Sequence, residues 1–100
     1  ISYLTIELKG EIPKDLRPMM GQRVYGCDVC QQVCPWNGFD WGDTPSHASP
    51  LFGPVAPSVS TPPLPDLLAM DEGAFQQRFA GTAVARIGLA RMLRNAAVAA

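Results

Sequence analysis

The sequence has few charged residues, and their charges nearly cancel. Only 17% of its 100 residues are charged, and the formal net charge at pH 7 is −1. This balance excludes a chain dominated by a basic nucleic-acid arm or by an acidic tail. Long hydrophobic runs are also absent, since no stretch approaches the ~18–20 apolar residues that a membrane span requires. Because 47% of the residues are nonetheless hydrophobic, we expect at most one small folded domain and no membrane attachment.

The sequence has no readable signal peptide, because no basic segment followed by an apolar segment opens it. It starts without methionine at Ile1 and stops at Ala100 inside a helical pattern. We therefore expect a fragment of a larger, cytoplasmic protein.

The charges are distributed unevenly along the chain. Residues 1–77 contain four basic and nine acidic residues, a net charge of −5. Residues 78–100 contain four arginines and no acidic residue, a net charge of +4. Such a basic segment is typical either of a surface that binds an anionic partner or of a solvated helix face.

A proline-rich segment divides the chain. Residues 44–65 contain seven prolines and no charged residue, and proline both fixes φ and removes a backbone donor. We expect a linker or loop there. The predicted organisation is therefore a cysteine-bearing segment at 1–43, then this linker, then a truncated helical segment at 66–100.

Little regular structure is expected before the linker. In Tyr3–Leu8, β-branched and aromatic residues alternate with others, which favours an extended segment, with a short helix as the alternative. Pro13 and Pro18 limit the following stretch to a short helical turn, for example at Lys14–Arg17.

After the linker the pattern is helical. Asp66 or Asp71 can cap a first helix, on which Phe75 and Phe79 share a face. Gly81 is a plausible stop for it.

Thr82 can cap a second helix that ends in alanines and has one apolar face. That face comprises Val84, Ile87, Met92, Leu93, Ala96 and Ala97. The arginines at 86, 91 and 94 fall largely away from it. We expect a mainly α chain with much irregular structure, ending in what looks like one unit of a stacked helical array.

All three cysteines lie within eight residues. Cys27, Cys30 and Cys34 form the pattern C-x2-C-x3-C-P, which Pro35 completes. Thiolates at such spacing are good ligands for iron–sulfur clusters or zinc. The pattern matches the last three cysteines and the proline of the bacterial ferredoxin run, whose first cysteine is replaced here by Val24.

In the two-cluster pattern the last cysteine of the run binds the other cluster. Cys27 and Cys30 would then bind one cluster, and Cys34 a second. Both clusters then need ligands from outside this chain, so we expect residues 1–43 to form an incomplete ferredoxin-like iron–sulfur segment.

Other interpretations of the cysteines stay open at this point. A structural zinc site of the three cysteines and His47 is chemically reasonable, although His47 lies in the proline-rich segment. Inert buried thiols are a further alternative. The aromatic residues Trp36, Phe39 and Trp41 favour an apolar shell that packs on a cluster and excludes solvent.

Three blocks of the sequence resemble the C-terminal part of epoxyqueuosine reductases. They are the opening I-S-Y-L-T-I-E, the Y-G-C-D-V-C-Q-Q-V-C-P-W-N block that begins at Tyr25, and the block from Phe75 to Asn95 with its G-T and R-N pairs. The resemblance covers most of the chain except the proline-rich segment.

This resemblance implies a ferredoxin-like part with two 4Fe-4S clusters, followed by helices that resemble HEAT repeats. It implies an oxidoreductase whose cobalamin domain lies elsewhere, and which converts epoxyqueuosine to queuosine at the wobble position of tRNA. Electrons from an external donor pass through the clusters to cobalamin. In the family a cysteine directly precedes the I-S-Y-L-T-I-E motif, which explains why only three are present here.

Residue by residue, the resemblance makes Cys27, Cys30 and Cys34 cluster ligands and places Asp28 and Val29 near the cobalamin. It also gives the chain a set of residues that face the tRNA anticodon loop: Lys9, Arg86, Arg91 and Arg94. The proton donor of the family lies outside this chain, so the fragment alone is expected to be inactive, and the full protein to act as a monomer. The competing hypotheses are an electron-transfer module of another oxidoreductase and a structural zinc module.

Overall fold

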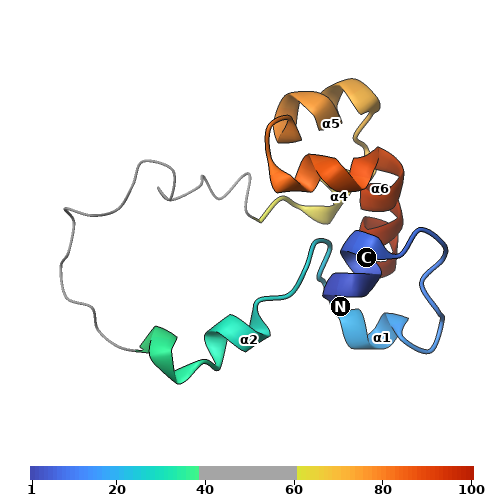
Figure 1. The fold of residues 1–100 in the computed structure, drawn as a ribbon. Coiled ribbons are helices and arrows are strands. Elements are labelled where there is room, and N and C mark those ends of the chain that lie inside the picture. Colours follow the sequence, from blue (N-terminus) through green and yellow to red (C-terminus); the bar gives the residue numbers. More distant parts are fainter. Residues whose placement is uncertain (39–60) are drawn as a thin grey trace, which may run out of the picture. The chain divides into compact units, whose positions relative to one another are not determined.

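The computed structural model describes residues 1–38 and 61–100, and within these ranges all regular structure is helical (Figure 1). The predicted mainly α chain with much irregular structure is therefore confirmed for the described residues. Three elements have non-α geometry: the π-helical turn η1 and the 3₁₀ turns η2 and η5. In chain order the elements are η1 (Tyr3–Glu7), α1 (Arg17–Met20), α2 (Val29–Gln32), η2 (Pro35–Gly38), α4 (Leu64–Leu68), α5 (Glu72–Phe79), η5 (Ala83–Ile87) and α6 (Gly88–Ala99).

The chain forms two compact units. The first combines Ile1–Cys27 with Pro62–Ala100, and the second is Asp28–Thr61. Residues at the two ends of the sequence therefore share one unit. The boundaries predicted at residues 43 and 66 stay a prediction, because most of the segment between them lies outside the described residues.

The core of the first unit is apolar and lies among its C-terminal helices. Its buried members are Leu67, Phe75, Phe79, Ile87, Met92 and Ala96. The rings of Phe75 and Phe79 lie 5.3 Å apart between centroids at 54°, a tilted geometry that aromatic pairs prefer. The prediction that these two residues share a face of the helix is confirmed, and both are buried.

Helix α5 confirms one of the two predicted caps, Asp71, and ends shortly before the predicted stop at Gly81. The Asp71 side chain accepts a hydrogen bond from the Ala74 backbone N–H at 2.8 Å, which satisfies a donor that the first turn leaves unpaired. After α5, Gly81 has a φ of +75°, a conformation that glycine adopts without the penalty of a Cβ. Asp66 lies in the first turn of α4 and does not cap α5.

The second predicted helix is divided into η5 and α6. Thr82 does not cap it, because its hydroxyl donates instead to the Phe79 carbonyl oxygen at 2.7 Å. The predicted apolar face is confirmed at Ile87, Met92 and Ala96, which are buried, whereas Ala97 is exposed.

The prediction of an extended conformation at Tyr3–Leu8 is wrong, and the alternative, a short helix, is what the structure shows. Residues 3–7 form η1, with the Leu8 N–H donating to the Tyr3 carbonyl at 2.9 Å. The Thr5 hydroxyl, 3.0 Å from the Ile1 carbonyl oxygen, also favours the helical turn. Side chains of α6 bind the carbonyls of this segment, so tertiary contacts outweigh the β propensity of its residues.

The short helical turn expected near Lys14–Arg17 lies further along the chain, as α1. Pro18 occupies its first turn, where a missing N–H removes no helical bond. Ile12, which precedes α1, and Met20, its last residue, are buried at 1% and 0% exposure. None of the described helices combines the length and apolar character that crossing a bilayer requires.

Candidate functional site

Cys27 ends the first unit and is half-buried. The residue before it, Gly26, has a φ of +68°. The Gly26 N–H donates to the Thr5 hydroxyl oxygen at 3.0 Å. The backbone that enters Cys27 is therefore tied to η1.

Cys30 and Cys34 belong to the second unit, on and just after α2. Cys30 is exposed and Cys34 half-buried. The Asn37 amide nitrogen donates to the Gln31 carbonyl at 2.8 Å and to its side-chain oxygen at 2.9 Å. The Asn37 N–H donates to the Cys34 carbonyl at 3.0 Å, so local bonds hold the turns around both thiols.

The three cysteines suit an iron–sulfur cluster by chemistry and access. All are free thiols, and none is buried. A thiolate is the ligand that such clusters require, and a partly exposed one can reach a metal. In the described ranges no group of three or more His, Cys, Asp or Glu side chains is arranged to hold a single metal ion.

The residues that flank the cysteines are also exposed. Asp28 is the N-cap residue of α2, and Val29, its first residue, is 41% exposed. Trp36, one member of the expected apolar shell, is 70% exposed. The other members, Phe39 and Trp41, lie outside the described residues, as does His47.

The Arg94 guanidinium is hydrogen-bonded to the N-terminal segment of the first unit. Its Nη1 donates to the carbonyls of Leu8 at 2.7 Å and Gly10 at 2.5 Å, and its Nη2 to the Leu4 carbonyl at 2.7 Å. Nε and Nη2 also donate to the Asn95 side-chain oxygen, at 3.1 and 2.8 Å. These five bonds match the five N–H donors of a guanidinium. Partial burial, and secondarily the charge of Arg91, lower the pKa of Arg94 from its usual value.

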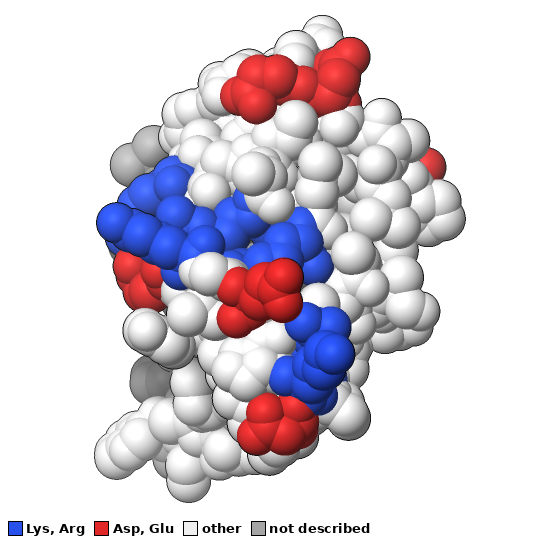
Figure 2. Space-filling view, turned by 90° about the vertical axis from the view of Figure 1, so that its right-hand side faces the viewer, with Lys and Arg blue, Asp and Glu red and all other residues white. Residues whose placement is uncertain are grey.

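The other three predicted tRNA-facing residues differ in their surroundings. Arg91 donates to the Ile6 carbonyl. Arg86 is exposed and forms an ion pair with Glu7 at 2.7 Å. Lys9 is exposed. These basic residues therefore do not share one kind of environment. Figure 2 shows acidic side chains beside basic ones on the face of the molecule that it draws.

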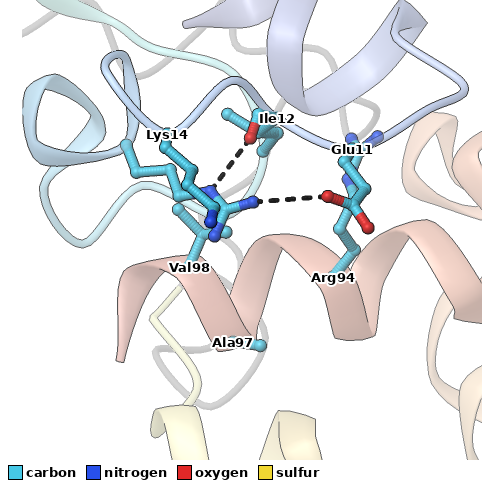
Figure 3. Close-up of a pocket in the computed structure, with 7 residues that line it drawn as sticks. Glu11, Ile12, Lys14, Arg94, Ala97 and Val98 are labelled. Atoms are coloured by element: carbon cyan, nitrogen blue, oxygen red, sulfur yellow. Dashed lines mark hydrogen bonds and ion pairs between the residues drawn. The ribbon is translucent and has the colours of Figure 1, made fainter.

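An open pocket beside α6 was not anticipated from the sequence. Its lining includes Glu11, Lys14, Arg17 and Arg94 (Figure 3). Arg17 donates to the Ile12 carbonyl at 2.9 Å and lies 3.8 Å from the Glu11 carboxylate. Three of the charged residues are cations and one is an anion, so the pocket carries a net positive charge. No sequence pattern indicated this pocket, because two stretches far apart in the chain, residues 11–17 and 94–98, form it together.

Two buried polar residues were also missed. Thr5 and Asn95 are both 0% exposed. The Asn95 amide nitrogen donates to the Thr5 carbonyl at 2.8 Å and to the Val24 carbonyl at 2.9 Å. A polar residue on the apolar face of an alanine-rich helix was the sequence signal, because such a residue needs a buried partner.

The N-terminal segment that contains the cysteines matches a known kind of domain. Residues 1–37 match the family model described as a 4Fe-4S double cluster binding domain. This match supports the iron–sulfur clusters that the cysteine spacing predicts.

Relatives that match nearly the whole of this chain are epoxyqueuosine reductases. Across 99 residues the chain is 50% identical to epoxyqueuosine reductase of Escherichia coli K12 and 48% identical to that of Yersinia pestis, covering 99% of this chain each time. The solved structure of epoxyqueuosine reductase from Bacillus subtilis covers 98% of it, with 36% identity and a TM-score of 0.82. The chain is therefore similar to one segment of the epoxyqueuosine reductases, and the resemblance seen in the sequence is confirmed.

The match covers only part of these relatives. The chain spans 25% of the Escherichia coli protein, 23% of the Yersinia pestis protein and 25% of the Bacillus subtilis chain.

Proposed function

We propose that this chain is the iron–sulfur and helical segment of an epoxyqueuosine reductase that converts epoxyqueuosine to queuosine at the tRNA wobble position. The observation that carries the proposal is the C-x2-C-x3-C-P run, which lies inside the 37 residues that match the double-cluster family model. The 50% identity to the Escherichia coli enzyme supports the particular reaction.

In this proposal the cysteines serve two clusters. Cys27 and Cys30 bind one 4Fe-4S cluster, and Cys34 binds the other, while ligands outside this chain complete both. Asp28 and Val29, exposed at the start of α2, lie near the cobalamin. When bound, the clusters supply one-electron transfer and cobalamin supplies the reductive chemistry at the epoxide. The role of this chain is to hold the thiolates in place and to contact the tRNA.

The basic residues contact the tRNA in two ways. Lys9 and Arg86 are exposed and can approach phosphates directly, which needs only charge and reach. Arg91 and Arg94 also face the tRNA in this proposal. Because the Arg94 donors are committed to carbonyls, it contributes charge rather than new hydrogen bonds. The helices α4 to α6 form the first part of a HEAT-like array in a cytoplasmic monomer, with an external protein or cofactor as the electron donor.

Metal analysis of the full-length protein, purified without oxygen, tests the proposal. We expect about eight iron and eight sulfide per chain, the content of two cubanes, with cobalt uptake after incubation with cobalamin. Iron and sulfide without cobalt uptake would instead support an electron-transfer module of another oxidoreductase. Zinc without sulfide would support a structural zinc module.

The division of ligands between the clusters has its own test. Cys30→Ser and Cys34→Ser should each lose the electron paramagnetic resonance signal of a different reduced cluster. Val33→Ser, an exposed neighbour of Cys34, is the matched control and should retain both signals. Loss of the same signal in both cysteine variants would contradict the division.

The tRNA surface is tested at the residues that do not hold the fold. Lys9→Ala together with Arg86→Ala should weaken tRNA binding and reduce the salt slope by about one for each cation removed. Gln76→Ala, a neutral substitution at an exposed position, should change neither. An unchanged slope in the double variant would remove these residues from the tRNA surface.

A further inference from the structure

A buried polar network joins α6 to the backbone that leads into Cys27. Asn95 on α6 and Thr5 on η1 are both 0% exposed, although they are 90 residues apart. Buried polar groups reduce stability unless they are paired. In the described residues no buried side-chain nitrogen or oxygen lacks a hydrogen-bond partner.

The Asn95 amide uses its full bonding capacity. Its two N–H groups donate to the carbonyls of Thr5 and Val24, and its oxygen accepts from Arg94. The reverse orientation would place the amide oxygen against two carbonyl oxygens, so the network allows only one. Asn95 therefore holds η1 and the segment that contains Val24 at a fixed distance from each other.

Thr5 continues the network toward the cysteine. Its hydroxyl donates to the Ile1 carbonyl at 3.0 Å and accepts from the Gly26 N–H at 3.0 Å. Gly26 directly precedes Cys27 and has a φ of +68°. This bond therefore sets the direction in which the backbone enters Cys27.

Thr5 also binds the start of the chain, just before η1. The backbone N–H of Thr5 donates to the Ile1 carbonyl at 3.0 Å, as does its hydroxyl. Thr5 thus ties Ile1 and Gly26 to one point, and Asn95 ties that point to α6. An apolar pair at these two positions would fill the core equally well but would not fix the two backbones relative to each other.

We propose that Thr5 and Asn95 are positioning residues for the Cys27 thiolate: the network holds the backbone at Cys27 so that its sulfur meets the iron in one geometry. The inference rests on the proposed function in one respect, that Cys27 is a cluster ligand. Groups behind a metal ligand that orient it typically affect metal affinity or activity by about 10–100-fold.

The test uses the full-length protein loaded with iron and sulfide under anaerobic conditions. Thr5→Val keeps the shape of the side chain but removes the acceptor for the Gly26 N–H. Asn95→Asp keeps the size but replaces both donors with an oxygen that faces two carbonyls. We expect each variant to release iron to a chelator roughly 10-fold faster and to shift the electron paramagnetic resonance spectrum of the cluster bound by Cys27, with the other cluster unchanged.

Three control variants separate positioning from stability. Thr5→Ser retains the hydroxyl and should restore the wild-type spectrum and release rate. Phe79→Leu lowers stability through the core on α5, and Thr82→Val removes a hydroxyl bond made to the Phe79 carbonyl. Both should leave the spectrum and the release rate unchanged.

Several results would overturn the proposal. Wild-type spectra and iron release in Thr5→Val and Asn95→Asp would do so, as would equal changes in Phe79→Leu. If Thr5→Val does not fold, the spectra and iron-release rates of Asn95→Asp and Thr5→Ser test the proposal in its place. An absence of any cluster in the wild-type protein would contradict the proposed function itself, and is seen before any variant is made.

Discussion

The two units of the chain differ in the interactions that stabilise their backbone. In the first unit, Ile1–Cys27 and Pro62–Ala100, an apolar core and a buried polar network fix the backbone. In the described part of the second unit, residues 28–38 and Thr61, no residue is buried. Its order rests on local bonds such as those from Asn37 to Gln31. Cys27 therefore belongs to a unit with a buried core, whereas Cys30 and Cys34 belong to a segment whose described residues form no core.

The largest expected effect contrasts a core residue with an exposed one. Phe75→Ala should lower the free energy of unfolding by about 3–5 kcal/mol, because Phe75 is fully buried and its loss leaves a cavity. Val33→Ala, at 71% exposure in the other unit, should change it by less than about 0.5 kcal/mol. Urea denaturation followed by circular dichroism measures both. Similar effects of the two substitutions would contradict the contrast.

A smaller effect is expected for the guanidinium that binds the N-terminal segment. Arg94→Ala should lower the free energy of unfolding by about 2–3 kcal/mol, because it leaves the carbonyls of Leu4, Leu8 and Gly10 without this partner. Arg94→Lys should recover only part of the loss, since an ammonium cannot reproduce the planar set of donors. Thermal unfolding of the three proteins checks the order, and an unchanged stability in Arg94→Ala would contradict the role given to this side chain.

The cap of α5 offers a test of local stability within the first unit. Asp71→Ala should lower the free energy of unfolding by about 1 kcal/mol, because it removes the acceptor for the Ala74 N–H. Asp71→Asn is the matched control and should change little, since asparagine is an equally good N-cap. A loss of the same size in both variants would mean that charge, rather than capping, matters at this position. Urea denaturation distinguishes the two.

The smallest effect is expected at the surface of the same unit. The Arg86–Glu7 pair is exposed at 64% and 54%, so its coupling should be about 0–1 kcal/mol. A double-mutant cycle with Arg86→Ala and Glu7→Ala measures it, and added salt should reduce it. A coupling well above this range would show that the pair contributes to the framework as Arg94 does.

Local patterns predicted the parts of the fold that depend on near neighbours. The cap at Asp71, the shared face of Phe75 and Phe79, and the stop at Gly81 each depend on residues a few positions apart. The cysteine spacing likewise predicted an iron–sulfur segment, because thiolate spacing is specific to the kind of site.

The turn at Tyr3–Glu7 shows where local patterns fail. Its residues favour an extended chain, yet they form η1 because Arg94 and Asn95 bind their carbonyls from about 90 positions away. The same contacts explain why Arg91 and Arg94 are not simply solvated. A charge pattern reveals which residues are basic but not which carbonyls they meet.

Residue types and their spacing were enough to predict the kind of site, three thiolates at ferredoxin spacing, and to recognise the resemblance to epoxyqueuosine reductases. The packing that surrounds these thiolates became visible only in the folded chain. It brought α6 against η1 and buried Thr5 and Asn95 together beside the backbone of Cys27. The physical reason is that ligand identity is set by residue type and spacing, whereas a buried hydrogen bond depends on which distant segments pack together.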